Sequence, residues 1–297
     1  RPWLLHRFRK SFRSQEDIER LDQALLKLTE EDPTFCVRQD KDSGQTIVSG
    51  MGELHLEIIT DRLSREFKLD INKGEPQVAY KEAITKTIRH HEVFEKDGGG
   101  KRLFADIQVE IGPAEKGKQG LIFESIVSND KLPRTYIAAV ERGFRNALNS
   151  GVLAGFPLEN LKVKLLEATY HPSDSEELAF EVAAQKSFRA CCEQAAPILL
   201  EPIMKTEVIS PDEYTGEIIA DLNKRRGQIE GMDSRADLKT IKAKVPLAEQ
   251  FGYVTVLRSL TSGRASSTME VSHYAEVPRN IAVTELKKVF GRVDLLK

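Results

Sequence analysis

Residues 205–232 read KTEVISPDEYTGEIIADLNKRRGQIEGM, and their pattern predicts how the last third of the chain folds. Lys205–Ile209 is typical of a strand. Residues 210–213 then predict a helix start, with an N-cap serine, a proline at the first helical position and a glutamate three residues after the cap. The buried face of this helix repeats with helical period and consists of Tyr214, Ile218 and Leu222. Gly227 is the expected C′ stop.

The residues that follow complete a recognisable order of elements. We expect strands around Gln228–Met232 and Lys239–Val245, a helix over residues 247–261 and a last strand at Ser267–Tyr274. The unit therefore reads β-α-β-β-α-β, which is the split βαβ arrangement of ferredoxin-like domains.

The beginning of the chain repeats that order. The apolar face of its first helix consists of Ile18, Leu21, Leu25 and Leu28. This helix ends at Glu31-Asp32-Pro33, because proline disfavours helical geometry in the residue before it. Strands at Phe35–Gln39 and Gln45–Ser49 follow, and Gly50-Met51-Gly52 opens a second helix. The apolar face of the second helix consists of Leu56, Ile59, Leu63 and Phe67. A last strand at Leu69–Asn72 completes the unit.

A middle region with a different pattern separates these two units. It predicts strands near Lys101–Ile111 and Leu161–Tyr170, and helices near Tyr136–Gly151 and Ser175–Ala195. Glu201-Pro202 is the expected joint to the last unit. The fold class is therefore α+β, with two ferredoxin-like domains that flank a third α+β domain. The expected boundaries are residues 1–80, 81–201 and 202–297, the last with a C-terminal tail.

Composition and charge narrow the class of protein. The chain has 297 residues, of which 40% are hydrophobic and 30% charged, as in a globular protein of two or three domains. No apolar run approaches the roughly 20 residues that a membrane span needs, and residues 1–10 lack the apolar core of a signal peptide. We therefore expect a cytoplasmic protein without membrane contact. Its formal net charge of −2 means that any RNA contact must come from local basic clusters.

The cysteines and histidines do not suggest a metal centre. Cys36, Cys191 and Cys192 have no CxxC spacing and no histidine at ligand spacing, so we expect buried or half-buried thiols. The neighbours His90 and His91 point to opposite faces of a strand. No metal ligand is therefore predicted.

Motifs for catalysis are also missing from the sequence. There is no GxxxxGK[ST] pattern to hold a nucleotide phosphate, and Gly98-Gly99-Gly100 precedes a strand, so it predicts a hairpin or interdomain turn. His171, Ser173 and Asp174, with Glu176 nearby, could suggest a hydrolase. However, they lie at the start of a helix, where capping accounts for acidic and hydroxyl residues. We therefore predict no catalytic residue.

Several longer motifs carry a family resemblance. Residues 50–56, GMGELHL, with Glu31-Asp32-Pro33 before them, resemble the third domain of elongation factor G. Residues 200–204, LEPIM, resemble the joint between its fourth and fifth domains. Four further stretches are similar to its fifth domain: Asp221–Gly227, Val245–Tyr253, Leu257–Leu260 and Gly263–Ala265. The matches keep their order from about residue 15 to residue 275, so the chain is identified as a member of this family.

The resemblance implies the domain plan and the cofactors. The chain would consist of domains III, IV and V, with a middle domain of the ribosomal protein S5 domain 2-like type. The GTPase domain is expected outside this chain, so GTP and magnesium are expected only there and no cofactor is expected here. The full-length protein is expected to be a GTPase that moves domain IV on the ribosome.

In the family, domain IV enters the decoding site of the small subunit, where messenger and transfer RNA move. By position, residues 128–134 and the turn that carries His171 form its tip. The expected tip residues are Ser128, Asn129, Asp130, Lys131, Leu132, Pro133, Arg134, His171 and Pro172. Lys131 and Arg134 can pair with phosphates, and His171 can donate to a phosphate or stack on a base. The alternative is a solvated hairpin with ordinary surface charges.

Two other surfaces follow from the resemblance. The helix that begins with Gly52, Glu53 and His55 is expected to face the protein's own GTPase domain, although a packed first helical turn explains the same residues. The last domain is expected to meet large-subunit RNA and stalk proteins through Lys224, Arg225, Arg226, Arg258 and Arg264. The helix macrodipole also favours cations near helix C-termini, so both interpretations can hold for the same side chains.

The sequence departs from the family pattern in several places. Residues 1–10 alternate weakly where the family has its first strand, which leaves open whether that strand is replaced, displaced or disordered. A GQYG-type stretch common in translocases is replaced by Gly100–Ala105, and Asp130 stands where translocases tend to have glycine. Gly100–Ala105, together with residues 42–46 (DSGQT) and Tyr170-His171-Pro172, resembles the second elongation factor G paralogue, which can split post-termination ribosomes together with the ribosome recycling factor.

Translocation of transfer and messenger RNA and ribosome recycling therefore both stay open as functions. A tetracycline-resistance ribosomal protection protein shares the domain plan, but the third- and fifth-domain motifs fit elongation factor G better. Two other classes are rivals. A hydrolase that uses His171 would turn over substrate by itself, and a protein-interaction scaffold would bind ribosomes independently of salt and of the tip residues.

Overall fold

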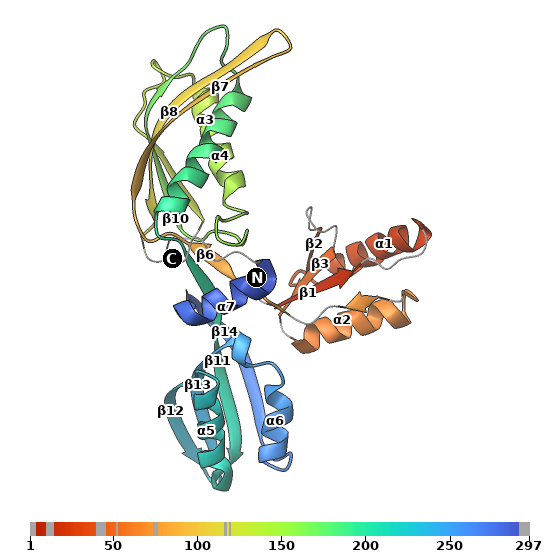
Figure 1. Ribbon diagram of the computed structural model, residues 1–297. Helices are drawn as coiled ribbons and strands as arrows, with labels where there is room; N and C mark the ends of the chain where they lie inside the picture. The colour runs from red at the N-terminus through yellow and green to blue at the C-terminus, as the bar shows by residue number, and fades with distance from the viewer. Residues whose placement is uncertain are drawn as a thin grey trace. The chain divides into compact units, whose positions relative to one another are not determined.

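The computed structural model describes residues 4–9, 15–39, 46–51, 53–69, 71–73, 77–115, 118 and 120–290 (Figure 1). The chain divides into two compact units. One comprises residues 1–79 and 201–275, and the other comprises residues 80–200 and 276–297. The division into three domains at the boundaries given above stays a prediction.

The first unit begins with a ferredoxin-like fold. Its elements are β1 (Leu4–Arg9), α1 (Gln15–Glu31), β2 (Cys36–Gln39), β3 (Thr46–Gly50), α2 (Glu53–Arg65), β4 (Asn72–Lys73) and β5 (Gln77–Val78). The sheet has the order β2-β3-β1-β4, with β5 paired to β1. This order confirms the predicted split βαβ arrangement. Residues 4–9 supply its central strand, with Leu4 opposite Gly50 of β3, so the expected first strand is present despite its weak alternation.

Both helices of this fold bury the faces that their periodicity predicts. The side chains of these faces that are at most 4% exposed are Leu21, Leu25, Leu28, Leu56, Ile59 and Leu63. α1 ends at Glu31, as the following Asp32-Pro33 predicts.

The strand predicted at residues 69–72 is wrong by three residues. Leu69 donates its N–H to Leu63 O at 3.2 Å and so lies in the turn that follows α2. Lys68 adopts φ +54° immediately before it, a left-handed conformation that is common after a helix. The strand itself begins at Asn72, as β4.

The second sheet of this unit repeats the arrangement. Its elements are β11 (Ile198–Pro211), η1 (Asp212–Tyr214), α5 (Thr215–Lys224), β12 (Gln228–Arg235), β13 (Leu238–Pro246), η2 (Leu247–Glu249), α6 (Tyr253–Leu260) and β14 (Ser266–Glu276). The strand order is β12-β13-β11-β14, which again is ferredoxin-like. Ile218 and Leu222 of α5 are buried against Val208 and Ile241 of the sheet, so the predicted helical face is confirmed.

Two predictions about this sheet and its helices are wrong in detail. Ser210 is not an N-cap, because it pairs with Lys239 in the β11–β13 ladder and its hydroxyl donates to Pro211 O at 3.1 Å. Helical geometry begins only after that strand, at Asp212. The helix predicted over residues 247–261 is divided, because Gly252 adopts φ +70° between η2 and α6.

The end of α5 differs by one residue from the prediction. Arg226, and not Gly227, adopts the left-handed conformation, with φ +55°. Arg226 N–H donates to Asn223 O at 3.2 Å and Gly227 N–H donates to Leu222 O at 2.9 Å, which together define a Schellman motif. Glycine occupies the next position, where a Cβ would come within 2.6 Å of Leu222 O.

The second unit contains a four-stranded sheet (Figure 1). Its elements are β6 (Lys81–Ala83), β7 (Ile88–Gly98), β8 (Lys101–Pro113), β9 (Leu121–Ser125), α3 (Arg134–Ala147), β10 (Leu161–Thr169), α4 (Glu177–Gln194) and α7 (Arg279–Phe290). α3 and α4 lie on one face of the sheet (Figure 1), and the short strand β6 pairs with residues 198–200 of β11. The sheet has the order β7-β8-β10-β9, in which β9 is parallel to β10 and α3 connects the two. The α+β fold class is confirmed.

Three elements of this unit have no counterpart among the predictions. β6 is a strand of three residues, β9 is a short edge strand, and α7 lies where a tail is expected. β7 contains the strand expected around His90 and His91 and extends over Ile88–Gly98. The hairpin prediction, by contrast, is confirmed. Gly99 and Gly100, at φ +60° and +83°, form a two-residue turn between β7 and β8, a conformation that glycine adopts without strain.

The thiols are buried in two of three cases. Cys191 and Cys192 on α4 are 0% exposed, and burial raises the pKa of the Cys191 thiol to about 12. Cys36 is exposed, so the expectation of a buried or half-buried thiol is wrong there. Cys36 lies on β2 at the edge of its sheet, where only one neighbouring strand can cover it.

One carboxylate is buried at the start of the second unit. Glu82 in β6 is 0% exposed, and its Oε1 accepts the N–H of Leu153 at 2.7 Å. Its Oε2 accepts the N–H groups of Ala154 at 3.1 Å and Phe156 at 2.8 Å. Burial raises the pKa of the Glu82 carboxyl above its ordinary value, although the backbone hydrogen bonds oppose this shift.

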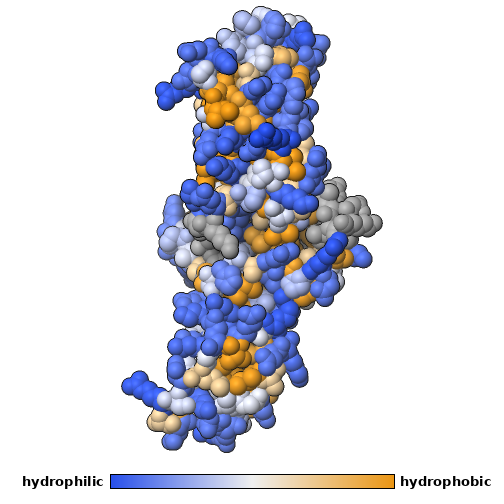
Figure 2. Space-filling view, turned by 90° about the vertical axis from the view of Figure 1, so that its left-hand side faces the viewer, coloured by the Kyte–Doolittle hydropathy of each residue, from blue (hydrophilic) through white to orange (hydrophobic). Residues whose placement is uncertain are grey.

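The surface is mixed rather than uniformly apolar. On the face in Figure 2, hydrophobic patches are interrupted by hydrophilic residues. Large exposed apolar side chains come from separate elements, among them Val93 of β7, Leu178 of α4 and Met269 of β14, and single exposed residues of this kind are normal. None of the described helices combines the length and the apolar character needed to cross a bilayer.

Candidate nucleic-acid interface

The first predicted loop, residues 128–134, is anchored at its middle. Ser128 O accepts the N–H groups of Lys131 at 3.0 Å and Leu132 at 3.2 Å, so the loop closes as a turn. Leu132 is 0% exposed and packs in the core, which makes it an anchor for the loop. Pro133 is half-buried, and the exposed members are Ser128, Asn129, Asp130, Lys131 and Arg134. Neither of the two cations forms an ion pair within the described part of the chain.

The second predicted loop is the turn of residues 170–175, called here the His171 turn. His171 O accepts the N–H groups of Asp174 at 3.2 Å and Ser175 at 2.9 Å. His171 Nδ1 lies 3.3 Å from Ser173 Oγ and 3.6 Å from Asp174 Oδ2. His171 and Pro172 are exposed, so the turn presents an imidazole to solvent from a hydrogen-bonded backbone.

Two residues that were not predicted as site residues, Tyr136 and Ser175, connect the two loops. Ser175 Oγ accepts the N–H of His171 and donates to Phe104 O, both at 2.8 Å. Tyr136 lies just after the first loop, and its hydroxyl donates to Ser175 O at 2.9 Å. Its ring packs against Tyr170, with 5.8 Å between centroids. The sequence signal for this connection is a tyrosine directly beside each loop, Tyr136 and Tyr170. Ser175 gives no such signal, because a serine before a helix predicts only a cap.

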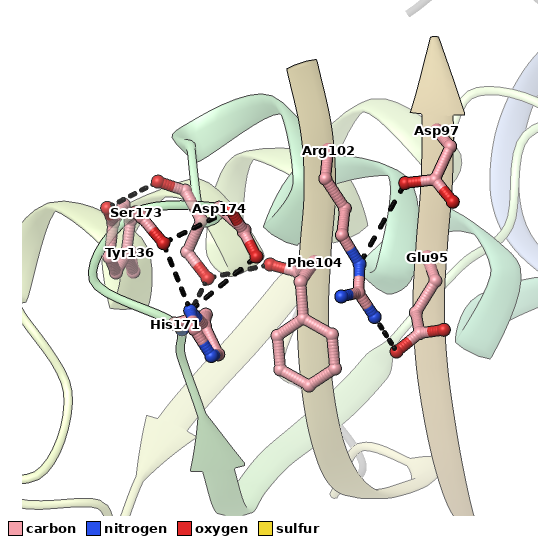
Figure 3. A network of polar contacts seen from close by, with 9 residues as sticks. Glu95, Asp97, Arg102, Phe104, Tyr136, His171, Ser173 and Asp174 are labelled. Carbon is pink, nitrogen blue, oxygen red and sulfur yellow. Dashed lines mark hydrogen bonds and ion pairs between the residues drawn. The ribbon is translucent and has the colours of Figure 1, made fainter. Parts of the chain in front are cut away.

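The β7–β8 hairpin lies beside the His171 turn. Figure 3 shows Arg102 of β8 between the acidic side chains of β7 and, next to it, Phe104 close to His171. The rings of His171 and Phe104 meet edge to face, with 6.3 Å between centroids. Lys101 pairs with Glu176 just before α4. Of the residues at positions 100–105, which were expected to depart from the family pattern, Phe104 contacts His171 and Lys101 pairs with Glu176 next to the His171 turn.

The geometry does not support a hydrolase. Ser173 and Asp174 both approach Nδ1 of His171, whereas a catalytic triad needs the serine at one ring nitrogen and the acid at the other. Ser173 Oγ donates to Asp174 Oδ1 at 3.1 Å. The capping interpretation is wrong as well, because the N-cap of α4 is Glu176 and no side-chain hydrogen bond caps the helix.

Of the residues predicted to face a GTPase domain, His55 is the one whose side chain is described. Gly52 lies outside the described residues, and of Glu53 only the backbone is described, as the first residue of α2. His55 Nδ1 accepts the N–H of Met51 at 2.9 Å, which assigns the ring proton to Nε2, 2.7 Å from Asp32 Oδ2. His55 therefore links the end of α1 to the start of α2.

The hydrogen bonds of Asp32 also affect its titration. The side-chain hydroxyl and the backbone N–H of Thr34 donate to Oδ1 at 2.6 Å and 2.8 Å. These bonds, followed by the bond from His55, lower the pKa of the Asp32 carboxyl. Asp32 is therefore held as a carboxylate between the two helices.

The basic residues predicted for large-subunit contact fall into two groups. Arg225 pairs with Asp221 at 3.0 Å and Arg226 pairs with Glu201 at 2.8 Å, so both guanidinium groups are engaged within the fold. The side chains that are exposed are those of Lys224, Arg258 and Arg264. Arg264 also forms an exposed ion pair with Glu213 at 2.7 Å.

Among the described residues, no three His, Cys, Asp or Glu side chains are placed to hold a metal ion.

Known families account for most of the chain. Three family models match: elongation factor G domain III at residues 11–75, domain IV at residues 76–196 and the elongation factor G C-terminus at residues 198–284. Fold and matched domains together define a class, the multidomain translation factors. Within that class, the chain belongs to the elongation factor G family.

Individual relatives agree with this membership. Proteins named elongation factor G from Amoebophilus asiaticus and Cytophaga hutchinsonii are each 50% identical, over 95% and 94% of this chain and 40% of each relative. One from Karelsulcia muelleri is 51% identical over 89% of this chain and 38% of its own length. A crystal structure of a Thermus thermophilus protein has a TM-score of 0.76 at 35% identity and covers 98% of this chain and 43% of that one. The chain thus spans about 40% of the length of these curated relatives.

Proposed function

We propose that this chain is the ribosome-contacting part of an elongation factor G that promotes translocation of transfer and messenger RNA. The observation that carries the proposal is the junction of the two tip loops through Tyr136 and Ser175. This junction supports a single rigid surface with Lys131, Arg134 and His171 exposed on it. Cations and an imidazole held in this way suit the phosphates and bases of RNA in the decoding site.

The chain would act mechanically and not through covalent chemistry. Its own GTPase domain, with GTP and magnesium, would supply the free energy, and the tip would prevent transfer RNA from slipping back. The exposed Lys224, Arg258 and Arg264 would contact large-subunit RNA and stalk proteins, whereas Arg225 and Arg226 would support the fold. α2 would face the GTPase domain. Such a protein would work in the cytoplasm, where ribosomes translate.

A second candidate function is ribosome recycling together with the recycling factor. The observation that favours it is the contact between the His171 turn and the β8 residues that depart from the translocase pattern. Phe104 meets the ring of His171 and Lys101 pairs with Glu176. Pro172 and the exposed Asp130 add two further departures on the same two loops.

The test compares both activities in the full-length protein that includes the GTPase domain. Translocation and recycling-factor-dependent ribosome splitting are each measured for wild type, His171→Ala and the control His273→Ala, an exposed histidine of β14. We expect His171→Ala to slow the active process by about tenfold, which corresponds to about 1.4 kcal/mol, and His273→Ala to leave it unchanged. Absence of both activities in wild type would overturn the proposal, and the activity present in wild type decides between the two functions.

A further inference from the structure

We propose that Ser175 is a positioning residue for His171, and that Tyr136 fixes Ser175 in turn. The inference rests on the proposed function of the His171 turn as an RNA contact. It assigns a role in that contact to two residues that need not touch RNA at all.

All four hydrogen-bonding groups of Ser175 are used in holding the turn. Its N–H donates to His171 O at 2.9 Å, and its Oγ accepts the N–H of His171 at 2.8 Å. The same Oγ donates to Phe104 O of β8 at 2.8 Å, and its carbonyl accepts the Tyr136 hydroxyl at 2.9 Å. Ser175 is 7% exposed. It therefore ties the backbone of His171 from both sides to β8 and to α3.

His171 has little else to fix its place. Its side chain is 61% exposed, and its contacts with Ser173 and Asp174 at 3.3 Å and 3.6 Å involve residues of the same turn. The ring of Phe104 is its one aromatic neighbour among the described residues. An exposed side chain is placed accurately only when the shell beneath it is locked. That shell is the backbone of the turn, which Ser175 holds at His171, while the Phe104 N–H holds it one residue before Ser175 by donating to Asp174 O at 2.9 Å.

Tyr136 connects this arrangement to the core and to the first loop. Its ring stacks on Phe180 of α4, with 4.8 Å between centroids and 19° between planes, and Phe180 is 0% exposed. The Tyr136 N–H donates to Pro133 O at 2.9 Å. Tyr136 therefore contacts the end of one loop through its backbone and the end of the other through its hydroxyl. The half-buried Tyr136 thus fixes the spacing between the two loops.

Removal of the Ser175 hydroxyl should loosen the turn without unfolding the unit. In Ser175→Ala the His171 N–H and the Phe104 carbonyl each lose a partner, while the N–H and carbonyl bonds of residue 175 remain. We expect amide hydrogen exchange in residues 170–175 to accelerate about tenfold, with exchange in α3 and α4 unchanged. Ser175→Thr keeps a hydroxyl and should restore slow exchange. Tyr136→Phe, which loses only its hydroxyl, should give the same acceleration to a smaller degree.

The experiment measures hydrogen exchange by mass spectrometry and the ribosomal activity on the same full-length protein. Ser125→Ala is the matched control, because Ser125 Oγ also accepts a nearby backbone N–H, that of Val127 at 3.2 Å, but does not touch the His171 turn. If Ser175 acts through His171, the Ser175→Ala and His171→Ala double variant is no slower than His171→Ala alone. Ser125→Ala should change neither readout.

Unchanged exchange over residues 170–175 in Ser175→Ala would overturn the proposal. So would additive losses of activity in the double variant, because these would mean that Ser175 acts independently of His171. If His171→Ala itself leaves the activity at the wild-type level, the proposed function of the turn fails. In that case the exchange rates alone decide whether Ser175 holds His171 in place.

Discussion

Arg226 holds Glu201 in a two-point ion pair, with Nη1 2.8 Å from Oε1 and Nη2 3.0 Å from Oε2. The side chain of Glu201 is 2% exposed, so this guanidinium is the charge partner of a buried carboxylate. Arg226 reaches it from the left-handed C′ position of α5, and its Nε lies 3.1 Å from Glu249 Oε1. A residue that was expected to contact the ribosome thus closes a helix and neutralises a buried charge.

Arg226→Met should strongly destabilise the protein. The substitution keeps an apolar stem of similar length but leaves Glu201 buried without a cation, which costs about 3–5 kcal/mol. The free energy of unfolding is measured by urea denaturation, followed by a probe in the sheet formed by β11–β14.

The matched control is Arg264→Met, which removes an arginine from an exposed pair with Glu213 in the same unit. Both partners there are more than half exposed, so the change should stay below about 1 kcal/mol. Equal losses in the two variants would contradict the view that burial of Glu201 makes its pair important. Glu201→Leu combined with Arg226→Met should recover much of the loss, because it removes the unpaired charge.

Glu82→Gln should destabilise the second unit although it keeps the size of the side chain. The carboxylate accepts three backbone N–H groups, those of Leu153, Ala154 and Phe156. An amide NH₂ would face at least one of these donors, and an unsatisfied buried group costs about 1–3 kcal/mol. Thermal unfolding at neutral pH measures the effect. Glu124→Gln, in an exposed pair with Lys162, is the control and should change stability little; a loss as large as that of Glu82→Gln would contradict the prediction.

The same residue predicts a pH dependence. Burial is the largest influence on the Glu82 carboxyl and raises its pKa in the folded state above the unfolded value of about 4.3. The folded state therefore binds this proton more tightly, which contributes stability below the unfolded pKa that is lost as pH rises through the folded pKa. Glutamine does not titrate, so the difference in unfolding free energy between wild type and Glu82→Gln should shrink between about pH 3 and about pH 7. A difference that grows over this range would show that the shift has the opposite sign.

The fold could largely be predicted because its signals are local. Helical faces such as Leu56, Ile59 and Leu63 and the glycine turn at residues 99–100 depend on spacing and on backbone preference. The errors arose where tertiary contacts prevailed over local preference. Ser210 has a strong N-cap sequence around it, yet nine paired positions between β11 and β13 extend the strand through it.

The site could be predicted only in part, because its geometry comes from distant segments. The family resemblance suggests Lys131, Arg134 and His171 as candidates, but no spacing in the sequence brings Phe104, Tyr136 and Ser175 together. Their hydrogen bonds join β8, α3 and the turn before α4. Likewise, Arg225 and Arg226 look like free cations in the sequence, and only the fold shows the carboxylates that engage them.

Lys131→Ala combined with Arg134→Ala should weaken ribosome binding and reduce its salt dependence. Both side chains are exposed, and each that contacts a phosphate would release counterions. The slope of log affinity against log salt should therefore fall by about one to two in magnitude. Equilibrium binding of the full-length protein to ribosomes across a salt series measures this slope. Arg145→Ala combined with Arg189→Ala removes the same charge from exposed helix pairs with Glu141 and Glu193, and it should leave the slope unchanged. An equal fall in both double variants would assign the salt dependence to overall charge and not to the tip.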